Sequence, residues 1–319
     1  MKFASIRPII VLISRELVIT ALLLLGVSFV VFMVLFLSPG DPFSNLLKAH
    51  AASVPIGTAA SGDPGGSGTW YLQYLSWLEN IVRGDFGTSF RTGLPVFSEL
   101  IRVGINTLYL TLGSLFITLL IAVPIAIVSA RRGMTAANWA MTMFTYVVSA
   151  LPVFWLGYIF IYISMHHFGL FPLVFGSGTQ KWSWVYFMLP AMVLGLSNGT
   201  MGEVVRHLRE ELSRVFAEEY ICTARAKGAS IWKHAFKEGF LIPITEIIAA
   251  KIPFILGGAV VVEQVFNWPG MGRMAWQAAQ DRDYPLILGI TIMAAIFVRS
   301  GSLIQRAVHI MVNPRSSRE

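Results

Sequence analysis

The most constraining feature of this sequence is its first long apolar run, because Leu17–Leu37 contains no charged residue. A bilayer core about 30 Å thick is spanned by about 20 apolar residues in helical form. A cleavable signal peptide is the alternative. The run is longer than the usual apolar region of about 7 to 15 residues, and no small-x-small cleavage site precedes Pro39-Gly40-Asp41-Pro42. We therefore predict that 17–37 is a retained membrane-spanning helix.

The rest of the chain repeats this pattern. The sequence is 55% hydrophobic and only 13% charged, with a mean hydropathy of +0.67, whereas soluble domains have about a quarter charged residues. Further apolar segments lie at 105–130, 139–165, 184–205, 240–262 and 285–311. The sequence therefore predicts an all-α integral membrane protein with about six spans and with both termini on the same side.

The distribution of Lys and Arg predicts which side that is. One compartment would hold most of the basic residues: Lys2, Arg7, Arg15, Arg131, Arg132, Arg206, Arg209, Arg214, Arg225, Lys227, Lys233, Lys237, Arg306, Arg315 and Arg318. By the positive-inside rule, that compartment is the cytoplasm. The termini 1–16 and 312–319 and the segment 206–239 are then cytoplasmic. The segments 38–104 and 263–284 are external.

The external segment 38–104 has two parts. Residues 50–69 are rich in Ala, Gly, Ser and Pro, and we expect a flexible loop there. Residues 70–82 have aromatic and leucine residues at helical spacing, which predicts a short interfacial helix rather than a ligand site. Four tryptophans suit the same outer interface: Trp182, Trp184, Trp268 and Trp276.

The sequence contains no set of residues that would predict catalysis or metal binding. It has no GxxxxGK[ST] phosphate loop and no HExxH, and its single cysteine, Cys222, allows no internal disulfide. His166 and His167 are adjacent and point apart, and the region His207–Glu211 lacks the second histidine of a zinc motif. The net charge of +7 is explained by topology, because the basic residues flank apolar runs, so we predict no nucleic-acid binding.

Polar residues inside the predicted spans are candidates for a translocation path, because such groups are costly in lipid and usually face a cavity or a partner. The candidates are Asn198, Glu246, Lys251 and Arg299. Pairing between spans or subunits is an equally good interpretation. Pro124, Pro152 and Pro190 lie within or near the ends of spans and favour kinked helices around a cavity.

The polar segment between the fourth and fifth predicted spans has a helix–turn–helix pattern. Glu218–Lys227 contains good helix formers, Gly228 suits a left-handed helix C-cap, and Ser230 can cap a second helix at 231–238. Small residues at Ala224 and Ala226 would allow close approach of another surface. Tyr220, Ile221 and Trp232 would supply apolar contacts of the kind that partner grooves accept.

This segment resembles the cytoplasmic "EAA" loop of ABC-importer permeases of the dipeptide/oligopeptide/nickel family, in the first-permease (B-type) branch. The resemblance rests on Thr223-Ala-Arg-Ala-Lys-Gly228 followed by Leu241-Ile-Pro243, and it covers nearly the whole chain. The other landmarks occur in the family's order: Leu37-Ser-Pro-Gly-Asp-Pro42, Arg83-Gly-Asp-Phe-Gly-Thr-Ser89, Arg91-Thr-Gly-Leu-Pro95, Asn106-Thr107, Ser149-Ala-Leu-Pro152, Glu263-Gln-Val-Phe-Asn-Trp-Pro-Gly-Met-Gly-Arg273, Arg282-Asp-Tyr-Pro285 and Asn313-Pro-Arg315. The chain departs from the loop pattern at Cys222 and Thr223, where the family has an acidic and a small residue.

The resemblance implies a type I importer transmembrane domain in a bacterial or archaeal cytoplasmic membrane. It implies three kinds of partner: a second permease subunit, two cytoplasmic ATPase subunits and an external solute-binding protein. ATP and magnesium would bind to the ATPases, so this chain would be no enzyme and would carry no cofactor. The residues expected to couple it to an ATPase are Glu219, Tyr220, Thr223, Ala224, Ala226, Gly228 and Trp232.

The resemblance favours di- and oligopeptides as the solute, with nickel chelates, glutathione, sugars or another small solute as alternatives. Two other classes are weighed against the importer. A stand-alone secondary transporter should show an inverted internal repeat, and we find none. A membrane-embedded enzyme should show a converging nucleophile and base or a metal set.

Overall fold

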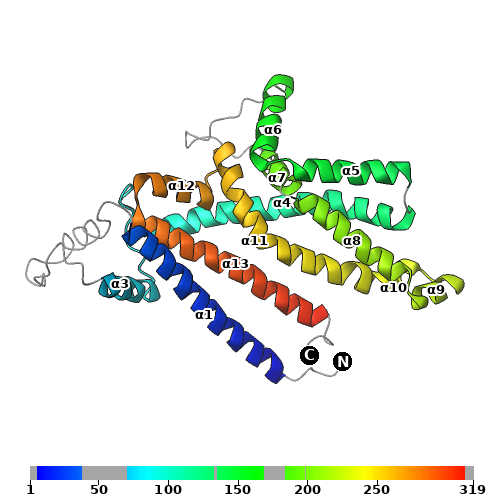
Figure 1. Ribbon diagram of the computed structural model, residues 1–319, viewed down its shortest axis with the longest axis horizontal. Helices are drawn as coiled ribbons and strands as arrows, with labels where there is room; N and C mark the ends of the chain where they lie inside the picture. Colours follow the sequence, from blue (N-terminus) through cyan, green and yellow to red (C-terminus); the bar gives the residue numbers. More distant parts are fainter. Residues whose placement is uncertain (1–5, 38–69, 133–134, 169–183, 198, 313–319) are drawn as a thin grey trace, which may run out of the picture. The chain divides into compact units, whose positions relative to one another are not determined.

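The computed structural model describes residues 6–37, 70–132, 135–168, 184–197 and 199–312. It divides the chain into two compact units, one made of Met1–Gly104 and Met274–Ile296 and the other of Ile105–Arg273 and Phe297–Glu319. The described secondary structure is helical (Figure 1), apart from an isolated antiparallel bridge between Thr88 and Pro95. The elements in chain order are α1 Ile6–Phe36, α3 Trp70–Val82, α4 Val96–Arg132, α5 Ala136–Ala150, α6 Val153–Phe168, α7 Trp184–Leu196, α8 Thr200–Phe216, α9 Glu219–Ala226, α10 Ile231–Ala235, the π-helical turn η1 Phe236–Leu241, α11 Ile242–Val265, α12 Met271–Asp281 and α13 Tyr284–Val312.

Several predicted features lie outside the described residues. They are the external loop 50–69, Trp182, Asn198, Asn313-Pro-Arg315, and the terminal residues 1–5 and 313–319.

Three described helices are long and apolar enough to cross a membrane: Arg15–Phe36, Val96–Arg131 and Tyr284–Leu303. A fourth candidate is the bent pair of Asn138–Ala150 and Val153–His167. The chain is therefore a multi-pass membrane protein, while the count of about six spans stays a prediction. Helix α4 begins nine residues before the predicted span at 105, and α1 begins eleven residues before residue 17.

In the first unit, α3 packs its aromatic side chains against α1. The Tyr74 ring lies edge-on to Phe32, with 5.2 Å between centroids, and its hydroxyl is 3.0 Å from the Ser28 hydroxyl. Phe32 is fully buried in a cluster with Leu288 that also includes Trp77. The helix covers the residues predicted for it, but half of the aromatic stripe packs within the protein. Trp70, Tyr71, Leu72 and Leu75 are exposed, and this side of the helix is suited to the headgroup region.

The first unit also joins two of the sequence landmarks. Asp283 is fully buried and precedes α13, where its Oδ1 accepts from the Leu286 N–H at 3.4 Å as an N-cap. Its Oδ2 accepts from the Ser89 hydroxyl at 2.5 Å and from the Arg91 N–H at 3.3 Å. Arg91 and Asp281 also form an ion pair at 3.4 Å. Segments about 190 residues apart in sequence are thereby tied together.

The predicted span 139–165 is not a single helix. It is broken between α5 and α6, and the chain bends by 103° at the break (Figure 1). Leu151 has an extended backbone conformation, with φ −69° and ψ 137°, as expected for a residue that precedes a proline. Pro152 therefore ends α5 rather than merely bending the span.

The predicted span 184–205 is broken as well. Helix α7 ends at Leu196, and α8 begins at Thr200 after Gly199, which has a φ of 72°. Ser149 at the end of α5 holds this second break. Its carbonyl accepts from the Gly199 N–H at 2.8 Å, and its hydroxyl accepts from the Gly202 N–H at 2.9 Å. The two helix breaks are thus fastened to each other.

Helix α8 then continues past the predicted end of the fourth span, from residue 205 to Phe216. Its buried residues recur at helical spacing: Met201, Val204, Val205, Leu208, Leu212 and Val215. The opposite side is polar, with exposed Arg206, His207 and Glu210. The end of the predicted span and the first part of the predicted segment 206–239 therefore form one amphipathic helix. It leads into α9 and α10, which contain the predicted coupling residues.

Candidate functional site

The candidate functional site is the polar segment 206–239, which is built as a small helical cluster in the second unit. Helix α8 ends at Phe216, and α9 follows after Glu218, whose backbone is extended. Val215, Ile221 and Ala235 are buried together, so that α8, α9 and α10 share one small core. The segment is therefore an ordered element with its own packing rather than a solvated loop.

Helix α9 has an inner and an outer face. Ile221 is fully buried and Ala224 is 6% exposed, so both lie against the chain itself. Glu219, Tyr220, Thr223 and Ala226 are exposed. Of the predicted coupling residues on this helix, all except Ala224 thus face outward. The small size of Ala224 serves packing within the segment.

Gly228 ends α9 as the sequence predicts. Its φ is +68°, in the left-handed region that a glycine adopts without steric cost. The Gly228 N–H donates to the Arg225 carbonyl at 3.1 Å, and the Ala229 N–H donates to the Ala224 carbonyl at 2.9 Å. These two bonds define a Schellman motif, which satisfies the last carbonyls of the helix. No atom lies within 4 Å of the position that a Cβ would take, so the turn is open to a partner.

The second helix of the segment differs from the prediction. It is α-helical only over Ile231–Ala235 and continues as the π-helical turn η1, and the Ser230 side chain makes no capping hydrogen bond. Glu238 in η1 accepts a hydrogen bond from the Tyr220 hydroxyl at 3.1 Å. Partial burial and this bond raise the pKa of Tyr220, so the phenol is protonated and donating at neutral pH.

Trp232 is directed inward rather than toward a partner. Its ring lies perpendicular to Phe216, with 5.9 Å between centroids, and the Arg131 guanidinium carbon lies 4.6 Å from its centroid. A guanidinium over an indole face is a favourable cation–π contact. Trp232 therefore fixes the coupling segment to the ends of α4 and α8, so that α9 is held by the membrane helices.

The predicted path residues are only partly described. Glu246 lies in α11 and Arg299 in α13, and both side chains are half-buried. Lys251 belongs to α11, but its side chain lies outside the described residues, as does Asn198 altogether. Their role in a translocation path stays a prediction.

Glu263 is the centre of a hydrogen-bond network that the sequence did not predict, although its members belong to the family landmarks. The fully buried Glu263 side chain accepts from the Thr107 hydroxyl at 2.7 Å and from the Arg273 N–H at 2.9 Å. The Thr107 hydroxyl in turn accepts from the Met271 N–H at 2.7 Å. Every polar atom of this carboxyl group and hydroxyl therefore has a partner in the loop 266–273 or in α4.

Neighbouring residues add two hydrogen bonds to the network around Glu263. The Asn106 amide donates to the Pro269 carbonyl at 2.8 Å, and the Trp268 indole donates to the Asn106 carbonyl at 3.2 Å. Trp268 is 1% exposed and packs on Phe187. The sequence did contain a signal, because Glu263 and Asn106-Thr107 are both family landmarks. Only the fold shows that they are in contact. We call residues 106, 107, 263 and 267–273 the outer clasp, because the sequence predicts that the segment 263–284 is external.

Within the described ranges, no group of three or more His, Cys, Asp or Glu side chains is placed to hold a metal ion. His166 and His167 are exposed at the end of α6, and Cys222 is exposed on α9.

Residues 122–318 match the family model described as "Binding-protein-dependent transport system inner membrane component". The chain belongs to this family. It is 36% identical over 308 residues to the oligopeptide transport system permease protein AppB of Bacillus subtilis, covering 92% of this chain and 95% of that protein. It is 30% identical over 293 residues to the glutathione transport system permease protein GsiC of Escherichia coli (90% and 92%), and 28% identical over 312 residues to the dipeptide transport system permease protein DppB of Alkalihalophilus pseudofirmus (89% and 92%).

Membership of this family makes the chain a transport component, a permease subunit embedded in a membrane as a multi-pass protein. It also implies ABC ATPase and solute-binding partners. The matched residues include the coupling segment and most of the outer clasp.

Proposed function

We propose that this chain is the permease subunit of an ATP-driven importer of di- and oligopeptides. The names of its relatives support a peptide-like solute, since they are permeases for oligopeptides, dipeptides and glutathione. In this proposal a second, similar permease forms the other half of the path. Two cytoplasmic ATPase subunits bind ATP and magnesium, and an external binding protein delivers the peptide.

The observation that carries the proposal is the two-sided structure of α9. Its inner face is packed through Ile221 into the core shared with α8 and α10, and its outer face exposes Tyr220 and Ala226 beside an open Gly228 turn. An element that is anchored on one side and exposed on the other can pass a displacement from a partner to the helices that carry it. ATP-driven closure of the ATPases would move α9 as a rigid body and change the access of the path.

The proposed orientation follows from the charges. Arg131 and Trp232 join the end of α4 to the coupling segment, so both belong to one side of the membrane. The excess of Lys and Arg predicted for that side supports placing it, together with the termini, in the cytoplasm. The outer clasp, at the other end of α4 and α11, then faces the binding protein.

An ATPase assay on the complete complex tests the coupling role. Ala226→Asp places a charge on the exposed face of α9, where it can disturb a partner but not the buried core. We expect loss of co-purified ATPase and of peptide-stimulated ATP hydrolysis, with the melting temperature unchanged. The matched control is His207→Asp, on the exposed side of α8, which should retain both. Full peptide-stimulated activity in Ala226→Asp would refute the coupling role of this face.

The proposed path contains Asn198, Glu246, Lys251 and Arg299. Two of these are cations that a carboxylate-bearing peptide would neutralise. We expect Lys251→Gln and Arg299→Gln to lower uptake of an acidic dipeptide more than that of a neutral one. Unchanged uptake and unchanged preference in both variants would remove these residues from the path.

A further inference from the structure

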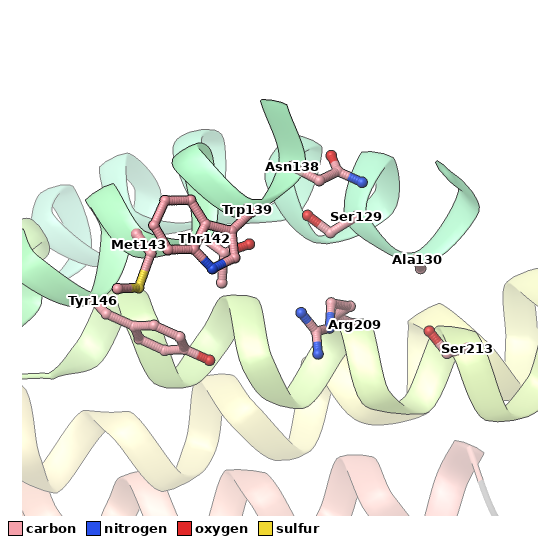
Figure 2. Close-up of a pocket in the computed structure, with 9 residues that line it drawn as sticks. All are labelled: Ser129, Ala130, Asn138, Trp139, Thr142, Met143, Tyr146, Arg209 and Ser213. Atoms are coloured by element: carbon pink, nitrogen blue, oxygen red, sulfur yellow. The ribbon is translucent and has the colours of Figure 1, made fainter. Parts of the chain in front are cut away.

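A cavity of about 380 Å³ lies in the second unit between the end of α4, the first half of α5 and the middle of α8 (Figure 2). None of the predicted coupling residues of α9 and α10 and none of the residues of the outer clasp lines it. Its lining residues are Ser129, Ala130, Asn138, Trp139, Thr142, Met143, Tyr146, Arg209 and Ser213. The set includes one cation and four hydroxyl groups, but no carboxylate. The cavity is therefore suited to an anion.

Arg209 is the charged centre of this cavity. Figure 2 shows its side chain rising from α8 into the space below Trp139 and Thr142, with the Tyr146 hydroxyl on the same side. No ion pair joins Arg209 to a carboxylate among the residues that the structure describes, and its side chain is half-buried. A guanidinium withdrawn from water gains most from an anionic ligand that can accept more than one of its hydrogen bonds.

Ser129 gives a second, independent indication of a ligand. It is only 8% exposed, and its hydroxyl has no hydrogen-bond partner in the part of the chain that is described. A buried hydroxyl that has lost water and gained no hydrogen-bond partner is unfavourable. Because Ser129 lines the cavity beside Asn138, an acceptor oxygen placed there would satisfy it.

The other side of the cavity opens onto apolar surface. Trp139, Met143 and Tyr146 follow one another at helical spacing along α5, and all three are exposed. Phe144 and Val147 add to the exposed apolar surface of the same helix, since they are 64% and 58% exposed. In a membrane protein such a face is suited to contact with hydrocarbon. A ligand that combines an anionic group with acyl chains would fill both halves.

We propose that this cavity binds the phosphate of an anionic phospholipid. Arg209 pairs with the phosphate, Ser129 and Thr142 donate to its oxygens, and the acyl chains lie along Trp139 and Met143. Basic pockets between membrane helices on the cytoplasmic side are suited to such headgroups. The same phosphate chemistry could come from free phosphate, but free phosphate would leave the apolar half of the cavity empty. The bound lipid would join α5 to α8, the helix that carries the coupling segment.

Native mass spectrometry tests this proposal on the full-length chain, purified in mild detergent with the subunits that accompany it. The probes are phosphatidylglycerol, phosphatidylcholine with the same acyl chains, and inorganic phosphate. We expect phosphatidylglycerol to bind about tenfold more tightly than phosphatidylcholine, and Arg209→Gln to abolish that difference. Arg206→Gln, one turn away on the exposed side of α8, is the matched control and should retain it.

A second variant separates the lipid from free phosphate. Trp139→Ala should weaken phosphatidylglycerol several-fold and leave inorganic phosphate binding unchanged. Equal losses in Arg209→Gln and Arg206→Gln would overturn the site, because they would show diffuse attraction to basic surface. Displacement of the lipid by millimolar inorganic phosphate would overturn the lipid as occupant. Unchanged lipid binding in a folded Arg209→Gln protein would overturn the proposal altogether.

Discussion

The outer clasp depends on a glycine that touches a carboxyl group. A Cβ added to Gly270 would overlap the Glu263 carboxyl group, whose oxygens already accept from Thr107 and Arg273. The carboxyl group cannot move aside without breaking those bonds. Close approach of backbone to a buried side chain is a specific reason for glycine at this position.

We therefore expect Gly270→Ala to destabilise the protein by about 1–3 kcal/mol, the range for overpacking a well-filled site. The measurement is the thermal unfolding midpoint of the purified chain in detergent. Gly26→Ala in α1 is the control, because nothing lies within 4 Å of its added Cβ and alanine is the better helix former. A melting temperature for Gly270→Ala as high as that of Gly26→Ala would contradict the clasp.

The contacts of the outer clasp could not be predicted from the sequence. Glu263, Asn106 and Thr107 were recognisable as landmarks, but their contact spans more than 150 positions and follows no local rule. Gly228 is the opposite case. Its left-handed conformation follows from the local end of a helix, and the sequence alone was sufficient to predict it.

Among the helices too, features that depend on the local sequence were predicted and features that depend on distant contacts were not. Apolar runs predicted where long helices occur, because hydrophobic length is a property of each segment alone. The breaks at Pro152 and Gly199 were not predicted as breaks, since a proline or glycine in a membrane helix is compatible with a mild kink. The broken geometry becomes favourable when the freed backbone groups find partners, and here Ser149 supplies them.

Ser149→Ala should therefore weaken the junction of the two breaks. The Gly202 N–H would lose its hydroxyl acceptor, which acts as an N-cap supplied by another helix, and such caps contribute about 1 kcal/mol. Thermal unfolding measures the loss. Ser164→Ala is the matched control, because the Ser164 hydroxyl donates to the Phe160 carbonyl of its own helix at 2.7 Å. Equal effects of the two substitutions would argue against a role for Ser149 at the junction.

The left-handed conformation of Gly228, in the turn after α9, leads to a prediction about coupling to the ATPase. Gly228→Asn should preserve the turn because asparagine tolerates the left-handed region, whereas Gly228→Val should strain it by about 1–2 kcal/mol. We expect peptide-stimulated ATP hydrolysis to fall strongly in Gly228→Val and little in Gly228→Asn. Equal loss in both variants would instead show that the partner needs the absence of a side chain, since the space around Gly228 is open within this chain.

At the scale of the whole molecule, helix α4 connects the coupling segment to the outer clasp. Helices α4 and α8 reach the coupling segment through Arg131, Trp232 and Phe216. At the opposite end of α4, the outer clasp ties it to the loop after α11. A movement of α9 would thus be transmitted along helices that are fastened at both ends. This arrangement supports rigid-body rocking rather than local rearrangement.

Chemical labelling of the native cysteine tests the proposed orientation in the membrane. Cys222 is the single cysteine of the chain and is exposed on α9. A membrane-impermeant maleimide should label it in inside-out vesicles and not in right-side-out ones, because the coupling segment faces the cytoplasm in our proposal. Arg83→Cys in a Cys222→Ser background is the reference for the other side, since Arg83 is 70% exposed after α3. Bound ATPase subunits should slow the labelling of Cys222 and leave that of the Arg83→Cys variant unchanged. Labelling of Cys222 from the outside would reverse the topology, and labelling that is indifferent to the ATPases would place their docking surface away from α9.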